Sequence, residues 1–121
     1  MLDEAVLLVK TFHEKAKQTV RESATLLSPN EIQRRIKWIS EELRELQEAE
    51  TVEEQADAIT DALYYLLGCY VEMGFLRPDN LFITIHESNM AKLSSTEIIY
   101  DTDGRVLKPK EWKHPQVNLD K

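Results

Sequence analysis

The sequence contains very little cysteine, glycine or proline, and each shortage narrows the class of protein. Cys69 is the only cysteine among 121 residues, so an internal disulfide and a multi-cysteine zinc site are both excluded. Its neighbours are apolar, which predicts a packed core thiol rather than a nucleophile. Only three glycines and four prolines interrupt the chain, which favours long helices.

Long apolar runs and an excess of basic residues are also missing. No apolar run is long enough to cross a bilayer and no leader is recognisable, so we expect a cytoplasmic protein without a membrane partner. The formal net charge of −7 disfavours binding to nucleic acid. An acidic protein can still bind phosphates where metal ions reverse the local field. The composition suits a single globular domain over residues 1–121.

Helical periodicity dominates up to about residue 93. The first helix is expected from about Leu2 to about Glu22, with His13 at the edge of its apolar face. The second begins at a capping box, Ser28-Pro29-Asn30-Glu31. It carries an apolar stripe at three- and four-residue spacing, made of Ile32, Ile36, Ile39, Leu43 and Leu46.

The third helix is expected from the capping box at Thr51 to Met73, before Gly74. The link to the second helix is short, so the two should pack antiparallel. The third helix is apolar nearly all round and should lie in the middle of an assembly. Four helices of one small chain do not surround it fully, so we expect a homodimer or homotetramer.

The remaining sequence predicts a fourth helix from Asp79 to Lys92 and then a change of character. Residues 97–107 resemble a small hairpin with Gly104 in its turn, and the tail after Pro109 should be extended. The expected fold is all-α, a four- to five-helix bundle. Its helical core covers about residues 2–93, and a C-terminal β-hairpin and extended tail cover about residues 96–121.

Four acidic residues on the second and third helices form the candidate metal site. Glu42 and Glu45 project from neighbouring turns of one helix, and Asp57 and Asp61 stack one turn apart on the next. Antiparallel packing brings the two sets together. Other glutamates nearby are interpreted as a solvated face, and Glu42 and Glu45 fall between the two interpretations.

The third-helix acids are the more informative pair because their helix is otherwise apolar. Unpaired carboxylates there would be costly to desolvate and would repel each other. No lysine or arginine of the third helix can pair with them. Oxygen ligands without cysteine or clustered histidine favour a hard ion, Mg²⁺ or Mn²⁺.

These residues resemble the MazG-like all-α nucleoside triphosphate pyrophosphohydrolases, and most of all their phosphoribosyl-ATP pyrophosphohydrolase-like branch. The resemblance covers residues 9–115 and rests on five landmarks in order. They are Phe12-His13, Leu27-Ser28-Pro29, the acidic core from Asp57 to Tyr64, Ser88-Asn89-Met90-Ala91-Lys92, and the segment from Asp103 to Pro109.

The resemblance implies hydrolysis of a nucleoside triphosphate between its α and β phosphates, giving a monophosphate and pyrophosphate. It implies carboxylate-bound metal, with Glu42 or Glu45 orienting or deprotonating the attacking water. The chain departs from the superfamily pattern at one position. Alignment on Asp61 puts Ala58 where a glutamate is usual, so we prefer Asp57 and Asp61 as ligands and leave the number of ions open.

Four further residues are candidate substrate-binding groups. Lys92 could contact a phosphate oxygen or could simply stabilise a helix C-terminus. Asn89 lies one turn before it and could face the same site. His13 could approach a base, although a packed histidine is the commoner case. Trp38 lies on the Glu42 side and is a candidate to stack on a base, although core or interface packing is commoner.

Two other functions compete with the pyrophosphohydrolase. The first is a non-catalytic helical protein whose acids bind metal or solvate a surface for an interaction partner. The second is a different metal-dependent phosphohydrolase that uses the same helices on another substrate. The identity of the phosphate product separates all three.

Overall fold

The computed structural model describes residues 1–93 and 97–119. These residues form four helices: α1 (Leu2–Lys15), α2 (Pro29–Glu48), α3 (Val52–Met73) and α4 (Asp79–Ala91). The expected all-α class is therefore confirmed. The chain divides into two compact units, a first unit of Met1–Arg77 and a second unit of Pro78–Lys121. Among the described residues, no helix combines the length and apolar character needed to span a membrane.

Helix α1 ends at Lys15, so the expectation that it continues to about Glu22 is wrong. Lys17 adopts a left-handed backbone conformation with φ of 58°. The Gln18 amide donates to the His13 carbonyl at 2.8 Å, and the Lys17 amide to the Glu14 carbonyl at 3.3 Å. This is the Schellman pattern of helix termination. Glycine usually occupies the left-handed position, and lysine there gave no signal in the sequence.

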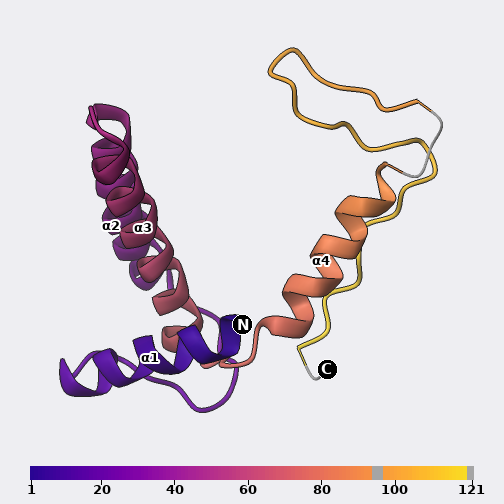
Figure 1. Ribbon diagram of the computed structural model, residues 1–121. Helices are drawn as coiled ribbons and strands as arrows, with labels where there is room; N and C mark the ends of the chain where they lie inside the picture. The colour runs from indigo at the N-terminus through magenta and orange to yellow at the C-terminus, as the bar shows by residue number, and fades with distance from the viewer. Residues whose placement is uncertain (94–96, 120–121) are drawn as a thin grey trace. The chain divides into compact units, whose positions relative to one another are not determined.

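Helices α2 and α3 lie side by side in the first unit, joined by a short link (Figure 1). The predicted capping box is present at the start of α2, where the Ser28 side chain and Glu31 bond each other's backbone amides. Thr51 caps α3 by accepting from the Glu54 amide at 3.1 Å. Gly74 ends α3 with φ of 82°, a conformation that glycine adopts without steric cost. Local sequence signals therefore predicted the start of α2 and both ends of α3.

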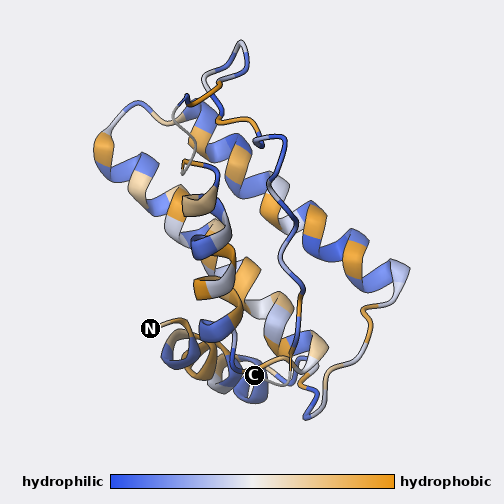
Figure 2. Ribbon diagram, turned by 90° about the vertical axis from the view of Figure 1, so that its right-hand side faces the viewer, coloured by the Kyte–Doolittle hydropathy of each residue, from blue (hydrophilic) through white to orange (hydrophobic). Residues whose placement is uncertain are grey.

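Helix α3 packs against both α1 and α2 and carries half of the apolar core. That core consists of Val6 and Val9 from α1 with Leu67 and Val71 from α3. Hydrophobic turns alternate with hydrophilic ones along the helices (Figure 2). The opposite face of α3 is exposed in the single chain, with Ile59 55% accessible and Leu66 50% accessible.

Helix α2 does not bury the apolar stripe that its sequence predicts. Ile32, Ile36 and Leu43 are all more than 40% exposed. The buried side chains of α2 are instead Glu31 and Arg35. The ion pairs Arg21–Glu31 and Arg35–Glu72 therefore occupy the buried side of α2.

The connector between α1 and α2 closes the carboxyl end of α3. The Thr25 amide donates to the Met73 carbonyl at 2.7 Å and the Arg21 amide to the Val71 carbonyl at 3.4 Å. The Arg21 guanidinium also donates to the Glu72 carbonyl at 2.7 Å. Carbonyls that a helix end would leave without partners are thus satisfied.

The second unit contains α4 and the C-terminal segment. The predicted hairpin is not formed as strands in residues 97–119, and residues 96, 120 and 121 of the expected hairpin and tail lie outside the described residues. A single antiparallel bridge joins Tyr100 and Val106. The Asp101 side chain accepts from the amides of Asp103 and Arg105. Side-chain bonds of Asp101 therefore add to the backbone bonds of this turn, in which the Asp101 amide donates to the Arg105 carbonyl at 2.9 Å and the Leu107 amide to the Ile99 carbonyl at 2.8 Å.

Candidate active site

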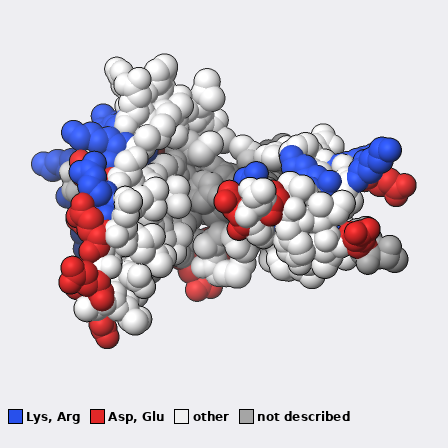
Figure 3. Space-filling view, turned by 90° about the horizontal axis from the view of Figure 1, so that it is seen from above, with Lys and Arg blue, Asp and Glu red and all other residues white. Residues whose placement is uncertain are grey.

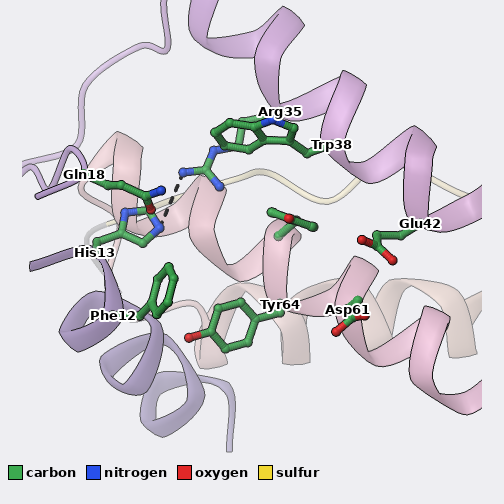
Figure 4. Close-up of a pocket in the computed structure, with 9 residues that line it drawn as sticks. Phe12, His13, Gln18, Arg35, Trp38, Glu42, Asp61 and Tyr64 are labelled. Atoms are coloured by element: carbon green, nitrogen blue, oxygen red, sulfur yellow. Dashed lines mark hydrogen bonds between the residues drawn. The ribbon is translucent and has the colours of Figure 1, made fainter. Parts of the chain in front are cut away.

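Helices α2 and α3 bring three carboxylates together. Glu42, Glu45 and Asp61 each offer an oxygen, and these oxygens all lie within 4.8 Å of one another. The spacing of three residues places both glutamates on one side of α2, and antiparallel pairing turns that side toward Asp61. Figure 4 shows the Glu42 and Asp61 side chains extending from neighbouring helices into the same space.

Glu42 is the acid in the cluster with an unsatisfied buried oxygen. Its Oε2 atom is shielded from solvent and has no hydrogen-bond partner among residues 1–93 and 97–119. Desolvation raises the pKa of the Glu42 carboxyl, and the neighbouring Glu45, Asp61 and Asp57 raise it further. A buried carboxylate oxygen beside two further acids is a donor set that suits a hard divalent cation. The residues present thus fit a metal ion.

Asp57 lies outside this group of three. It is exposed on α3 and lines a separate surface hollow with Glu45, Glu48 and Glu54. The expectation that Asp57 and Asp61 are the buried acids is wrong, because Asp57 is exposed and Asp61 is not fully buried. Glu42, for which the sequence left two interpretations open, is the shielded one.

A cavity of about 300 Å³ continues from the acids along the inside of α2 and α3. Acidic, aromatic and basic side chains share its wall (Figure 4). The lining residues are Phe12, His13, Gln18, Arg35, Trp38, Glu42, Asp61, Tyr64 and Tyr65. Four predicted site residues therefore share one cavity, namely His13, Trp38, Glu42 and Asp61.

His13, expected at the edge of the apolar face of the first helix, is buried, with 2% of its surface accessible. Its Nδ1 atom lies 3.0 Å from the Thr19 carbonyl oxygen. Since a carbonyl only accepts, Nδ1 carries the proton and Nε2 is left as an acceptor. Nε2 lies 3.5 Å from Nη2 of Arg35. The ring is packed and also borders the cavity.

Trp38 forms part of an aromatic group inside the cavity. Its ring lies 5.7 Å from the Tyr65 ring, and the Arg35 guanidinium lies 5.1 Å from its centroid. Phe12 and Tyr64 form a second ring pair, edge to face at 5.8 Å. These rings give the cavity an aromatic section, and the same cavity is lined by the acids Glu42 and Asp61.

Sequence reasoning missed a buried ionic network next to the cavity. Arg35 donates from Nε and Nη2 to the two carboxylate oxygens of Glu72, at 3.5 and 3.4 Å. Arg21 donates to Glu31 at 2.9 Å, and Arg34 lies 3.7 Å from Glu72. Arg35 precedes Glu42 by seven residues and Trp38 by three, so helical spacing placed it on the site face of α2.

Asn89 and Lys92, the other predicted substrate-binding residues, belong to the second unit. Asn89 is exposed near the end of α4. The Lys92 ammonium lies 5.0 Å from the centroid of the Trp112 ring, and that ring's Nε1 donates to the Ser88 carbonyl at 2.7 Å. Their contact with a substrate stays a prediction.

Comparison with known proteins identifies the family of this chain. The model of the phosphoribosyl-ATP pyrophosphohydrolase family matches residues 7–89. The chain belongs to this family. No curated protein matches it. As a member of a pyrophosphohydrolase family, the chain is placed among hydrolases that act on acid anhydrides.

The match covers the part of this phosphoribosyl-ATP pyrophosphohydrolase family member that carries the cavity. Residues 7–89 contain all the lining residues and the three clustered acids. They include Asn89 but end before Lys92 and the turn at Gly104. The resemblance inferred from the sequence is thus confirmed at the level of the family.

Proposed function

We propose that this protein is a Mg²⁺-dependent nucleoside triphosphate pyrophosphohydrolase that cleaves between the α and β phosphates. The observation that carries the proposal is the cluster of Glu42, Glu45 and Asp61, of which Glu42 and Asp61 line the cavity. Within the described residues, the buried Oε2 atom of Glu42 has no hydrogen-bond partner. Family membership supports the reaction class.

Glu42, Glu45 and Asp61 would hold the metal ion, with Mn²⁺ as the alternative to Mg²⁺. When bound, the ion offsets the charge of the phosphates and polarises the scissile bond. The acids alone would repel a triphosphate. Glu42 or Glu45 would accept the proton of the attacking water at a carboxylate oxygen. Asp57, on the same side of α3 and one turn from Asp61, could join the ligand set when a second ion or the substrate is bound.

The rest of the cavity would hold the nucleoside. Its aromatic rings offer apolar surface for a base. They form two pairs, Trp38 with Tyr65 and Phe12 with Tyr64. A volume of about 300 Å³ is at the lower end of the range for small-molecule sites. In this proposal Asn89 and Lys92 contact phosphate oxygens, and His13 borders the nucleoside.

A product assay tests the proposal. Purified protein is incubated with canonical and modified nucleoside triphosphates and Mg²⁺ or Mn²⁺, and pyrophosphate and orthophosphate are measured separately. We expect pyrophosphate and monophosphate, with Asp61→Asn about 100-fold slower, which corresponds to about 2.7 kcal/mol of transition-state stabilisation. Glu48→Gln, an exposed acid of the same helix pair, serves as the matched control and should keep full activity.

The competing functions give other results. Orthophosphate alone would identify a different phosphohydrolase. A non-catalytic metal-binding protein would release neither product, yet Mg²⁺ would still raise its melting temperature, and Asp61→Asn would abolish that increase.

We also propose that the chain forms a homodimer or homotetramer in the cytoplasm. Apolar side chains are exposed on all three helices of the first unit, among them Leu8 (72%), Ile36 (57%) and Ile59 (55%). Figure 3 shows large surface areas without acidic or basic side chains. A second copy would remove this surface from water. Light scattering should report a dimer or tetramer, and Ile59→Lys should shift it toward the monomer; a wild-type monomer at high concentration would refute this.

A further inference from the structure

Arg35 is a buried cation at the cavity wall for which the hydrolysis proposed above has no use. Its side chain is 5% exposed and lines the same cavity as Glu42 and Asp61. Burying a charged side chain such as arginine costs free energy, which its ion pair must offset. The hydrogen bonds of Arg35 show what it does at the cavity wall.

Two of the three guanidinium nitrogens of Arg35 already donate hydrogen bonds, and the third, Nη1, does not within the described residues. Nε and Nη2 donate to Glu72, and Nη2 also approaches Nε2 of His13. Among the described residues, nothing accepts a hydrogen bond from Nη1. Figure 4 shows the guanidinium projecting into the cavity between His13 and Trp38.

Gly68 provides the space that Nη1 occupies. A Cβ atom at this position would lie 2.6 Å from Nη1 of Arg35 and 3.2 Å from Nε2 of His13. Helix α3 therefore has no side chain at the point where Nη1 of Arg35 lies. Glu72, His13 and Gly68 together hold Arg35 in one orientation with Nη1 left to donate.

The chemistry of the missing acceptor follows from charge and position. Arg35 and Glu72 form a neutral pair, and Arg34, the second cation beside Glu72, is 46% exposed and screened by water. Because Glu72 offsets its charge, Arg35 attracts an anionic phosphate less strongly than an unpaired arginine would, while Nη1 can still donate to a neutral acceptor. Arg35 lies seven residues from Glu42, about 10 Å along α2, which is beyond the phosphates and beside the rings that suit a base.

We propose that Nη1 of Arg35 donates to an exocyclic carbonyl oxygen of the substrate's nucleobase, with the base against Trp38. Arg35 is thus a specificity-determining residue, held by Glu72. This inference rests on the proposed nucleotide substrate. It predicts that bases with a carbonyl oxygen at this position are preferred over analogues that lack it, because loss of the acceptor leaves a buried donor unpaired.

Binding of nucleosides without phosphate or metal tests the inference apart from hydrolysis. Tryptophan fluorescence is titrated with two matched pairs, inosine with purine riboside and uridine with 2-pyrimidinone riboside, each pair differing in one exocyclic oxygen. We expect the carbonyl-bearing member of at least one pair to bind about tenfold more tightly. Trp38→Phe should abolish the signal, because the base is proposed to lie against Trp38.

The variants are chosen so that neither Arg35 nor Glu72 is left as a buried charge without its counterion. Arg35→Gln combined with Glu72→Gln removes both charges and should bind the two members of each pair equally, at the wild-type affinity of the weaker member. Arg34→Gln is the matched control and should keep the tenfold preference. Circular dichroism confirms that each variant is folded.

Four results would overturn the inference. They are equal binding of both pairs by the wild type, discrimination retained in the double variant, no binding of any nucleoside, and a double variant that loses affinity for inorganic triphosphate but not for nucleosides. The last would make Arg35 a phosphate ligand. Release of pyrophosphate is measured separately, so each result leaves the proposed hydrolysis to its own assay.

Discussion

The two ends of the cavity in the first unit carry charge in opposite ways. At one end Glu42, Glu45 and Asp61 lie together, and no lysine or arginine in the described part of the chain is paired with them. At the other end Arg35 is bonded to Glu72, and nearby Arg21 is bonded to Glu31. The paired charges hold three segments of the chain together. The unpaired ones repel each other and need something from outside. The comparison therefore separates ion pairs that maintain the fold from acids that await a cation, with Arg35 also lining the cavity.

The largest expected effect comes from breaking the ion pair between Arg35 and Glu72, at what is called here the paired end of the cavity. Glu72→Ala leaves Arg35 buried without its counterion, and we expect it to lower the free energy of unfolding by about 3–5 kcal/mol. Urea denaturation measures this. Arg34→Ala, which removes the exposed partner of the same carboxylate, should cost under about 1 kcal/mol. Equal losses for the two variants would mean that burial of the pair is unimportant.

A smaller effect is expected from crowding the paired end. Gly68→Ala places a methyl group against Nη1 of Arg35 and should destabilise the protein by about 1–3 kcal/mol. The same substitution in the Arg35→Gln and Glu72→Gln background should cost less, because the shorter glutamine leaves room. A penalty that is unchanged there would show that the strain lies elsewhere.

The sequence predicted three helix boundaries that carry capping or glycine signals. It also predicted that acids of the second and third helices come together, as Glu42, Glu45 and Asp61 do. Ser28, Thr51 and Gly74 act through contacts within a few residues, so local pattern was enough. It did not predict the end of α1, because Lys17 adopts a conformation that its side chain disfavours. The Arg35–Glu72 pair joins residues 37 positions apart, and only the packing of α2 on α3 brings them together. The exposure of Asp57 likewise depends on which face of α3 is covered.

Neutralising the unpaired end should stabilise the protein in the absence of metal. Glu42→Gln removes a carboxylate that burial and three acidic neighbours disfavour, so its melting temperature in EDTA should exceed that of the wild type. Added Mg²⁺ should raise the melting temperature of the wild type and not of the variant. A variant that melts lower than the wild type in EDTA would show that Glu42 supports the fold.

The two ends should also respond to acid in opposite directions. The Ser28 amide, Arg21 and the Ser28 hydroxyl hold the pKa of Glu31 at about 2, below its ordinary value of 4.5. The stability that Glu31 contributes is therefore present above pH 4.5 and is lost as the pH falls toward 2. The raised pKa of Glu42 has the reverse sign, so its unfavourable contribution disappears as the pH falls from that raised value to 4.5. Unfolding curves of Glu31→Gln and Glu42→Gln against pH check this, and parallel curves would contradict it.

The connector between α1 and α2 has a consequence for local opening of the protein. Because the amides of Arg21 and Thr25 donate to carbonyls of Val71 and Met73, a segment outside any helix is part of the hydrogen-bonded end of α3. These two amides should exchange with deuterium at rates close to those of the last turn of α3 and far below those of the exposed amides around them. The last turn can then fray only when the connector lifts away, so the two form one cooperative unit.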